Sequence, residues 1–532
     1  MIGLGIGDVV RIAAQPQRFG NKTALIWRDR SFTYAEVNAQ VNRAAGALAG
    51  CGVRRGERVA VLGRNCPEYV WLYFALAKLG AIAVPVNFWY RSGEVAYTLR
   101  QSDATVLVYD QRFANVVHPA LQAIDSPPCT LTWGGVQDEL AAAMAGMSPD
   151  EPPEAATPED HHIILYTSGT TGFPKGALFT QAAHTLHALA WALMTEQHAG
   201  DVGLLVYPLF HTGGPDCILL PHFLVGGTVV LLDGADPQEM LAAIEQHRAT
   251  NVFCVPTVWR RLLAAIDSAP FTPDVSSVRR CLGSSDTLPP ELLDGILSHF
   301  PADVYVTYGL TEAGCILTYS RLTVEHREKI RSVGRPHPLV ELRLLDPDGH
   351  EVSPGDVGEV CARGPTLMEG YWHLPEQTAQ ALAGGWLRSG DLGYVDPDGY
   401  LILAGRAKDV IITGGEKVYP LEVERLLKQH PGIADVALVG VPDPEWGESV
   451  LACVVRAPGA AAAPLTEASL QEWIRPRLAG YKRPRYVAFL DALPVTTATG
   501  KVQKAVLREQ FGGRYREAAE ARIRDHGLGS KE

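Results

Sequence analysis

The sequence has no run of apolar residues that approaches the roughly 18 residues of a membrane-spanning helix. It also lacks an excess of basic residues, because 59 aspartates and glutamates outnumber 47 lysines and arginines and give a formal net charge of −12. These absences argue against a membrane-spanning protein and against a general binder of nucleic acids or anionic membranes. An anionic ligand would therefore need a local site with its own positive and hydrogen-bonding groups.

Cysteine is present but never clustered. The nine cysteines stand singly between Cys51 and Cys453, without a Cys-x-x-Cys motif and without a group of closely spaced cysteines and histidines. This spacing argues against a disulfide framework and a zinc site, and it favours reduced thiols in a cytoplasmic protein. The N-terminal stretch MIGLGIGDVVRIAAQ carries no basic segment ahead of its mildly apolar residues, so we do not expect a signal peptide.

Short apolar segments alternate with helix-length amphipathic segments through most of the chain. The helix-like segments include YVWLYFALAKLG and PQEMLAAIEQHRA, and the strand-like ones are RVAVLG, TVLVYD, IILYTSG, GLLVYPL, TVVLL and NVFCV. This alternation predicts parallel sheets covered on both faces by helices, in a large α/β body that runs to about residue 404. Segment 124–160 is rich in proline, alanine and acidic residues, and we expect it to be a surface excursion.

The pattern changes from about residue 331. The stretch VELRLLDPDGHEVSPGDVGEVCARG alternates apolar and polar residues between Asp-Gly and Pro-Gly turns, which predicts antiparallel strands or a small barrel. Helix-like PLEVERLLKQH and strand-like DVALVGV and VLACVVRA follow, and they suffice for a second, smaller α+β domain.

One short loop stands out by composition. YTSGTTGFPKGA (166–177) combines glycines, hydroxyl side chains and a single lysine without any acidic residue. Glycines let backbone N–H groups approach an anion, hydroxyls add donors, and a lysine supplies a point charge for phosphate. It is not a Walker A loop, which requires Gly-Lys-Ser/Thr. A polyphosphate site and a plain surface turn both fit the loop alone; the residues that a polyphosphate would contact are Thr167, Ser168, Gly169, Thr170, Thr171, Gly172 and Lys175.

Further motifs follow this loop in a fixed order. They are YGLTEAG (308–314), GGWLRSGDLGYVDPDGYL (384–401), GRAKDVIITGGEKVYPLEVE (405–424) and LPVTTATGKVQK (493–504). Together with the loop they resemble the adenylate-forming superfamily of acyl-CoA synthetases, peptide-synthetase adenylation domains and luciferases, over about residues 20–510. PLFHTGG, GYWHLPEQT and GVPDPEWGE are most similar to fatty-acyl and aryl CoA ligases.

The resemblance implies an α/β fold with a large N-terminal domain, built from two doubly wound subdomains and a small β-barrel, and a mobile, smaller α+β C-terminal domain. It places the N-terminal domain at 1–404, a hinge at 405–410 and the C-terminal lid domain at 411–532. We expect residues 510–532 to be poorly ordered, because the tail is charged and contains glycine.

The resemblance also implies the reaction. Such enzymes join a carboxylic acid to the α-phosphate of ATP with release of pyrophosphate, and coenzyme A then displaces AMP. Lys501 matches the lysine that bridges the attacking carboxylate and the α-phosphate. Glu312 matches the Mg²⁺ ligand, with Thr167 or Thr311 nearby, and Thr311 matches a hydroxyl on the α-phosphate. The site needs such groups because both reactants are anionic.

Other residues match nucleotide contacts. Asp391 corresponds to the carboxylate that accepts hydrogen bonds from the ribose hydroxyls, and Arg406 corresponds to a second ribose or phosphate contact. The stretch CLGSSDTLP replaces the small-residue stretch that lies along the adenine, and Asp286 departs from the usual pattern. The residues expected near the base are Gly283, Ser284, Ser285, Tyr308 and Gly309.

The second half-reaction involves the remaining motifs. His211 in PLFHTGG matches a gate between the carboxylate pocket and the thiol tunnel. Lys408 occupies the hinge position about which the C-terminal domain rotates. Gly414, Gly415 and Glu416 match a loop that lies beside the pantetheine arm of coenzyme A, although a plain interdomain linker fits the same segment.

The substrate class follows in part. Amino-acid adenylation domains hold the substrate ammonium with an aspartate at the position of His211, so we expect a hydrophobic acid without an α-amino group. Segments around Trp191, Gly213, Pro256–Thr257, Ser284 and Leu310–Ile316 would form its pocket. Two alternatives remain: an acyl-AMP ligase that loads a carrier protein, and a non-catalytic ligand-binding relative. We expect no nucleic acid partner, and a homo-oligomer remains open.

Overall fold

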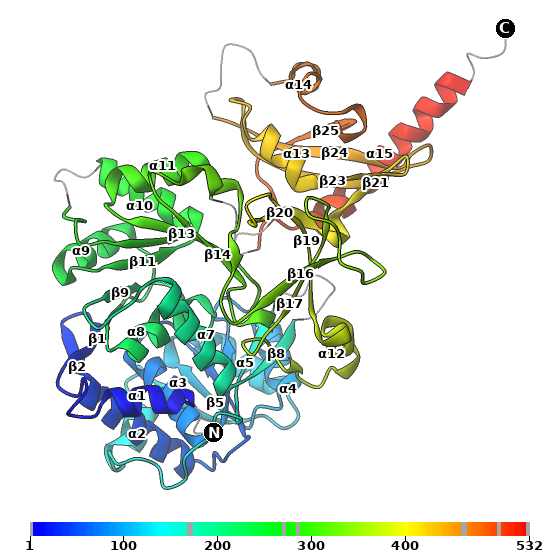
Figure 1. Ribbon diagram of the computed structural model, residues 1–532. Coiled ribbons are helices and arrows are strands. Elements are labelled where there is room, and N and C mark those ends of the chain that lie inside the picture. The colour runs from blue at the N-terminus through cyan, green and yellow to red at the C-terminus, as the bar shows by residue number, and fades with distance from the viewer. Residues whose placement is uncertain are drawn as a thin grey trace. The chain divides into compact units, whose positions relative to one another are not determined.

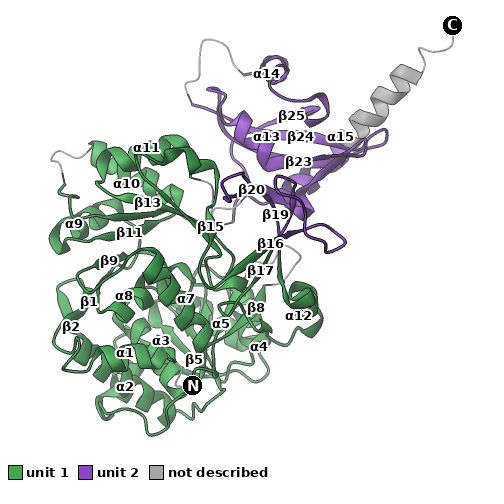
Figure 2. Ribbon diagram, viewed as in Figure 1, with its two compact units in different colours: residues 1–342, 361–388 green, residues 343–360, 389–532 purple. Residues whose placement is uncertain are grey.

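A computed structural model describes residues 4–167, 174–268, 273–283, 288–458, 465–496 and 502–527 (Figure 1). The chain forms two compact units, one of residues 1–342 and 361–388 and one of residues 343–360 and 389–532 (Figure 2). Each unit has hydrophobic core clusters of its own. Ser168–Gly172, Ser284, Ser285 and Lys501, all predicted to contact nucleotide or substrate, lie outside the described residues.

The first sheet of unit 1 has seven strands in the order β18-β8-β7-β4-β3-β5-β6. Neighbouring pairs among β3 to β7 are parallel, whereas β8 and β18 are antiparallel to their neighbours. The strands are β3 (Arg58–Leu62), β4 (Ile82–Val86), β5 (Val106–Asp110), β6 (Cys129–Trp133), β7 (His161–Thr167), β8 (Lys175–Thr180) and β18 (Gly370–Tyr371). The helices that connect or flank them are α3 (Pro67–Leu79), α4 (Ser92–Gln101), α5 (Ala114–Gln122), α6 (Glu139–Ala145) and α12 (Pro375–Ala381).

The second sheet has nine strands in the order β15-β14-β13-β12-β11-β9-β10-β1-β2. Its strands are β1 (Thr23–Trp27), β2 (Arg30–Thr33), β9 (Val202–Leu205), β10 (Thr228–Leu231), β11 (Asn251–Cys254), β12 (Arg280–Gly283), β13 (Asp303–Tyr308), β14 (Thr318–Leu322) and β15 (Arg335–Pro336). Its helices are α1 (Ile6–Ala13), α2 (Tyr34–Gly50), α7 (Gln181–Met194), α8 (Leu220–Val225), α9 (Pro237–His247), α10 (Pro256–Ser268) and α11 (Pro290–His299).

Local sequence explains where several of these elements begin. Helix α2 starts after Thr33, whose hydroxyl accepts from the Glu36 N–H at 3.2 Å while the Glu36 carboxylate accepts from the Thr33 N–H at 2.8 Å. This reciprocal cap satisfies N–H groups that have no partner inside the helix. Helix α9 starts with Pro237 after Asp236, whose carboxylate accepts from two N–H groups of the first turn.

Six central strands of the nine-stranded sheet, from β13 to β1, run parallel. Their side chains are buried on both faces, since every residue of β10, β11 and β12 is buried. The chain leaves β9 for β10 on one side and returns to β11 on the other side. A ligand site in a doubly wound sheet lies beyond the carboxyl ends of the strands at such a reversal. The fold therefore predicts a ligand site near the segment that follows β9.

Unit 2 contains a five-stranded sheet in the order β22-β21-β24-β23, with β25 paired to β24. The strands are β21 (Ile411–Thr413), β22 (Glu416–Val418), β23 (Ile433–Asp443), β24 (Gly447–Arg456) and β25 (Tyr486–Leu490). The helices are α13 (Pro420–Leu427), α14 (Glu467–Ile474) and α15 (Lys504–Gly527). Helix α15 covers part of the tail for which we expected poor order.

The predicted α/β class, with two doubly wound sheets and a smaller α+β domain, is confirmed. The predicted barrel region is a four-stranded sheet in the order β16-β17-β19-β20, formed by β16 (Glu341–Leu345), β17 (Gly358–Arg363), β19 (Leu387–Val395) and β20 (Leu401–Arg406). The expectation for 124–160 needs a correction, because this segment contributes the edge strand β6 and helix α6. In the part of the chain that the structure describes, no helix is long and apolar enough to cross a membrane.

Candidate active site

The motif YGLTEAG forms a tight turn between β13 and β14. Tyr308 ends β13 and is buried, and its carbonyl accepts from the Leu317 N–H at 2.8 Å. A Cβ atom at Gly309 would lie 1.9 Å from the carbonyl oxygen of Cys315, so only glycine fits there. The short 3-10 helix Thr311–Ala313 then carries Thr311 and Glu312. Close packing in the turn therefore explains the first glycine of the motif. The turn also fixes the backbone that carries Thr311 and Glu312.

The predicted phosphate loop is anchored at both ends by the seven-stranded sheet. Thr167 ends β7 and lies opposite Lys175, the first residue of antiparallel β8. The residues between them that were predicted to bind phosphate lie outside the described part of the chain. Lys175 itself is half-buried, and its Nζ lies 4.5 Å from the ring centre of Tyr371. A cation at this distance from an aromatic face is held by the ring's negative face.

Tyr371 also contacts Glu312. Its hydroxyl donates to Glu312 Oε1 at 2.8 Å, and the main-chain oxygen of Glu312 accepts from the Met368 N–H at 2.9 Å. The structure therefore brings Lys175 and Glu312, which are far apart in the sequence, to one tyrosine that sequence analysis did not single out. A carboxylate oxygen is the type of ligand that Mg²⁺ prefers, and Mg²⁺ usually takes few protein carboxylates. Glu312 fits that donor chemistry.

His211 lies in the segment that leaves β9 at the reversal of strand order. Its Nδ1 accepts from the Gly213 N–H at 3.1 Å, and its ring centre lies 6.3 Å from that of Tyr207. Tyr207 stacks on Phe253 with 4.6 Å between ring centres and 16° between planes. A Cβ atom at Gly213 would lie 3.0 Å from Tyr207, so this position stays small. The histidine is thus oriented beside an aromatic wall.

Asn65 supports this segment and was missed by sequence analysis. It is buried, donates to the carbonyls of Tyr207 and Leu232 at 2.8 and 3.1 Å, and accepts from the Leu209 N–H at 2.9 Å. An amide is needed for this pattern, because only an amide side chain combines two donors with an acceptor. The sequence around it, RNCPE, carries no signal of contacts about 140 residues away.

Two parts of the predicted pocket wall, Trp191 and the segment Leu310–Ile316, both contact Cys217. Trp191 is fully buried and donates to the Cys217 carbonyl at 2.9 Å. Cys217 Sγ lies 3.6 Å from the Sγ atom of Cys315. Cys315 belongs to the segment Leu310–Ile316, which sequence analysis assigned to the pocket wall. Burial raises the pKa of the Cys217 thiol, which keeps it uncharged. All nine cysteines are free thiols in the structure.

In unit 2, the two predicted ribose contacts meet across a strand pair. Asp391 on β19 lies opposite Arg406 on β20, and Arg406 Nε is 3.1 Å from Asp391 Oδ1. The Asp391 N–H donates to Ser389 Oγ at 3.0 Å. The Asp391 side chain is only 12% exposed whereas that of Arg406 is 42% exposed, so the carboxylate is held while the guanidinium reaches solvent.

The predicted hinge residue Lys408 lies in a single 3-10 turn after β20. Burial lowers the pKa of its ammonium group, and the charge of Asp409 opposes this shift. Asp409 in turn pairs with Arg508 at 2.7 Å. The predicted hinge segment is therefore charged, and Arg406 and Asp409 form ion pairs with other residues of unit 2.

The glycine loop of unit 2 is a tight hairpin between β21 and β22. Thr413 pairs with Glu416, and the two residues between them have positive φ angles, +58° at Gly414 and +85° at Gly415. A two-residue hairpin with both central φ angles positive requires residues such as glycine. A Cβ atom at Gly414 would lie 2.6 Å from Trp446, whereas one at Gly415 would meet nothing within 4 Å. The turn itself therefore explains the glycines, and Gly415 leaves open space beside it.

Lys501 lies outside the described residues, but its neighbours are placed. Val495 and Val502 form an antiparallel bridge, and the Gln503 N–H donates to the Pro494 carbonyl at 2.8 Å. Lys504 pairs with Glu424 at 2.7 Å. This bridge and this hydrogen bond join the described residues on either side of 497–501.

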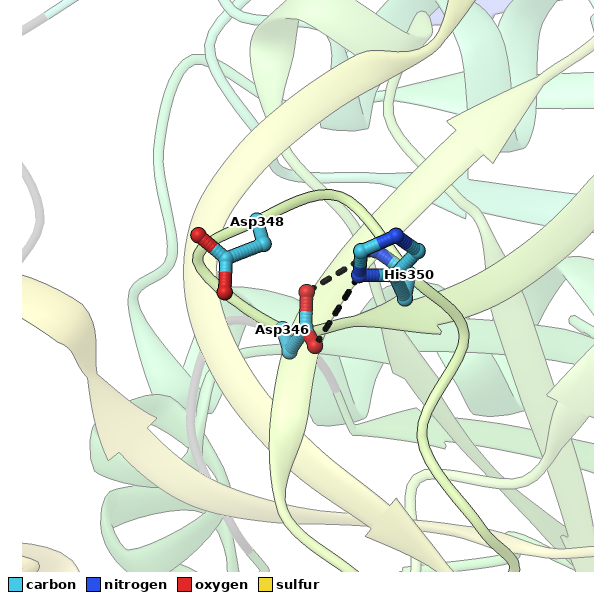
Figure 3. A group of neighbouring side chains, drawn as sticks. All are labelled: Asp346, Asp348 and His350. Atoms are coloured by element: carbon cyan, nitrogen blue, oxygen red, sulfur yellow. Dashed lines mark hydrogen bonds and ion pairs between the residues drawn. The ribbon is translucent and has the colours of Figure 1, made fainter.

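One other group of potential metal ligands occurs among the described residues. Asp346, Asp348 and His350 gather on the turn that follows β16 (Figure 3). The Asp346 carboxylate accepts from the His350 N–H at 2.8 Å, and the His350 side chain is 81% exposed. These contacts are those of an Asp-containing turn, so the group does not replace Glu312 as the predicted Mg²⁺ ligand.

Two family profiles match this chain. A profile of the AMP-binding enzyme family matches residues 12–372, and a profile of the AMP-binding enzyme C-terminal domain matches residues 422–501. The chain is 40% identical over 512 residues to a feruloyl-CoA synthase from an Amycolatopsis species, which covers 96% of this chain and 99% of that protein.

Two further similarities concern the carboxylic acid that is activated and the molecule that accepts the acyl group. A fatty acid–[acyl-carrier-protein] ligase from Streptomyces coeruleorubidus is 34% identical over 499 residues, which cover 92% of this chain and 93% of that protein. Among solved structures, an anthranilate CoA ligase in complex with anthranoyl-AMP matches with a TM-score of 0.86 and 31% identity, over 96% of this chain and 98% of that chain.

Proposed function

This chain belongs to the AMP-binding enzyme family and is an ATP-dependent acyl-CoA synthetase; we propose that its substrate is an aromatic carboxylic acid without an α-amino group. The observation that carries the proposal is the pairing of His211 with the stacked rings of Tyr207 and Phe253 beyond the carboxyl end of β9. A flat, apolar acid suits such a wall, since aromatic pairs favour stacked or edge contacts.

The first half-reaction needs charge neutralisation. The acid oxygen attacks the α-phosphorus of ATP, the bond to the β-phosphate oxygen breaks, and pyrophosphate leaves. We assign Lys501 to the acid and the α-phosphate, Lys175 to the outer phosphates, and Glu312 to Mg²⁺. Magnesium, when bound, would neutralise charge on the phosphates during the displacement. Lys175 and Glu312 share a contact to Tyr371, which supports their assignment to one site.

The same proposal assigns the nucleoside. Tyr308, Gly309 and the stretch Gly283–Ser285 would lie along the adenine, and Asp391 with Arg406 would hold the ribose. The 3.1 Å contact between Asp391 and Arg406 supports this, because it places the two predicted ribose contacts next to each other and holds the carboxylate in position.

In the second half-reaction, the thiol of coenzyme A attacks the acyl carbon and AMP leaves. We propose that the domain 411–532 rotates about the hinge 405–410, so that Lys501 serves the first step and the Gly414–Glu416 hairpin serves the second. Such rotation would be gating rather than chemistry. Tight hairpin geometry at Gly414 and open space at Gly415 support a narrow thiol path there. We also propose a cytoplasmic location, in keeping with nine free thiols.

A matched pair of acids tests the substrate proposal. 3-Phenylpropanoic acid and phenylalanine differ only by the α-ammonium group. We expect ATP–pyrophosphate exchange with the first acid and at least about 100-fold less with the second, because an ammonium in an apolar pocket without a counter-ion is costly. Equal exchange with both acids would show that an ammonium site exists and would refute the proposal.

Carrier loading is the second candidate function, and the likeness to a fatty acid–carrier ligase favours it. The enzyme should be given one activated acid together with either coenzyme A or a phosphopantetheinylated carrier protein. Thioester on coenzyme A supports the synthetase. Thioester formation on the carrier alone would show that the carrier, and not coenzyme A, is the acyl acceptor. The adenylation step would be unaffected by this result.

A further inference from the structure

The motif GYWHLPEQT forms a compact unit that fixes Tyr371. Strand β18 pairs antiparallel with β8, so that Tyr371 lies opposite Ala177, and helix α12 begins shortly afterwards at Pro375. The Tyr371 N–H donates to Thr378 Oγ1 at 2.8 Å, and the same hydroxyl donates to the Leu374 carbonyl at 2.8 Å. A Cβ atom at Gly370 would lie 2.7 Å from the Thr378 side chain. Glycine and threonine are therefore both needed to hold the tyrosine in place.

The side chain of Tyr371 joins two predicted parts of the phosphate site. Its relative exposure is 9%, its hydroxyl donates to Glu312 Oε1, and its ring faces Lys175 Nζ. The hydroxyl donates to Oε1 of Glu312. This hydrogen bond restricts the rotation of the carboxylate and so fixes the direction in which Oε2 points. A tyrosine hydroxyl carries its proton at neutral pH, so in this bond the hydroxyl is the donor and the carboxylate is the acceptor.

We propose that Tyr371 is a positioning residue of adenylation: its hydroxyl orients the Glu312 carboxylate for the divalent cation, while its ring holds Lys175 at the end of the phosphate loop. This inference rests on the proposed function, because it takes Glu312 as the Mg²⁺ ligand. It goes further by assigning a task to a tyrosine outside the nucleotide motifs. A carboxylate left without the bond would sample more rotamers and bind the cation more weakly.

The two contacts of Tyr371 are separable by substitution. Tyr371→Phe removes the hydroxyl but keeps a ring under Lys175, so only Glu312 loses a partner. Tyr371→Leu removes both contacts. A purely structural role for the side chain predicts that Phe replaces Tyr without a change in metal dependence, because the two rings pack alike.

The test is a Mg²⁺ titration of ATP–pyrophosphate exchange, together with fluorescence titration of a labelled ATP analogue with and without chelator. For Tyr371→Phe we expect the half-saturating Mg²⁺ concentration to rise about tenfold, with nucleotide affinity in chelator unchanged. The matched control is Tyr34→Phe, because the buried Tyr34 hydroxyl donates to the Gly227 carbonyl, away from the site. It should leave the Mg²⁺ dependence as in the wild type.

A double-mutant comparison keeps the inference falsifiable if a variant is destabilised. On a Glu312→Gln background, Tyr371→Phe should add less than about a twofold further change, because the two residues act through one bond. A wild-type Mg²⁺ dependence in Tyr371→Phe would overturn the inference. Independent, additive effects of the two substitutions would overturn it as well.

Failure of the inference is distinct from failure of the proposed function. Mg²⁺-dependent exchange in the wild type, with a large loss in Glu312→Gln, supports the metal site whatever Tyr371→Phe shows. If Glu312→Gln leaves the Mg²⁺ dependence unchanged, the metal assignment itself is wrong, and the role of Tyr371 falls with it.

Discussion

Arg406 Nε lies 3.1 Å from Asp391 Oδ1, across the paired strands β19 and β20. The two residues were predicted separately from different motifs, and the register of one hairpin places them opposite each other. The Asp391 carboxylate is mostly buried, and the ion pair with Arg406 holds it in place across the hairpin.

Replacing Asp391 should weaken nucleotide binding. Asp391→Ala removes the proposed acceptor for the ribose hydroxyls, and a hydrogen bond to a charged group contributes about 1.5–3 kcal/mol. We expect the KM for ATP to rise about 10- to 100-fold in ATP–pyrophosphate exchange. Asp398, an exposed aspartate in the β19–β20 turn, supplies the control. An equal change in Asp398→Ala would show that the effect came from the hairpin rather than from ribose recognition.

Lys501→Ala should separate the two half-reactions. The lysine is proposed to stabilise only the transition state of adenylation, so exchange should fall about 100-fold or more while conversion of supplied acyl-AMP and coenzyme A to product continues. Single-turnover assays of each step provide the measurement. Lys504→Ala serves as the control, because Lys504 pairs with Glu424 and has no proposed chemical task. Similar losses in both steps for Lys501→Ala would contradict the assignment.

Gly415→Leu should have the opposite effect. A leucine would fill the open space at this position, so adenylation should continue while thioester formation falls about tenfold or more. Because φ is +85° at Gly415, leucine also introduces backbone strain of about 1–2 kcal/mol. Gly355→Leu is the matched control, since Gly355 has φ +93° and no atom within 4 Å of its Cβ position. Retained thiolation in Gly415→Leu would count against a thiol path there.

Acid should destabilise unit 1 through buried histidines. His222 is fully buried, donates from Nδ1 to the Ile218 carbonyl at 2.7 Å, and accepts at Nε2 from Asn251 at 3.0 Å. Burial lowers its pKa from 6.5 to about 4, with nearby Arg280 and Lys22 acting in the same direction and Asp201 opposing. The neutral ring therefore stabilises the fold fully above pH 6.5, and that contribution is lost as the pH falls toward 4.

The size of this effect follows from the same pKa difference. Between pH 7 and pH 5, His222 should account for about 2 kcal/mol of lost unfolding free energy. Urea unfolding followed by tryptophan fluorescence should show that His222→Gln is less stable than the wild type at pH 7, with a gap that narrows by about that amount at pH 5. The exposed His350 gives the control variant His350→Gln. A gap for His222→Gln that stays constant with pH would contradict the account.

Much of the fold was predictable because burial on both faces leaves a strong local pattern. The apolar segments RVAVLG, TVLVYD, IILYTSG, GLLVYPL, TVVLL and NVFCV all contain strands, from β3 to β11. Their β-branched residues fill the interior of two sheets that helices cover on both sides. Strand β6 escaped prediction because it lies at a sheet edge, where most of its side chains are only partly buried, within a proline-rich segment.

Candidate site residues could be predicted only where chemistry is concentrated in short motifs. Lys175 and Glu312 were predicted from their own sequence neighbourhoods. Tyr371 was not, because its strand β18 has two residues and its partners lie nearly 60 and 200 positions away. Asn65 escaped for the same reason. Contacts of this kind are set by the folded sheets, and a single sequence carries no local signal of them.

The most direct test of the central claim is ATP–pyrophosphate exchange over a panel of carboxylic acids, with product mass spectrometry in the presence and absence of coenzyme A. The panel should span aromatic acids, short, medium and long fatty acids, bulky polycyclic acids and amino acids. The account predicts exchange strongest with aromatic acids, acyl-AMP without coenzyme A, and the matching acyl-CoA when it is added. Exchange confined to amino acids, or acyl-AMP that never passes to coenzyme A, would contradict it.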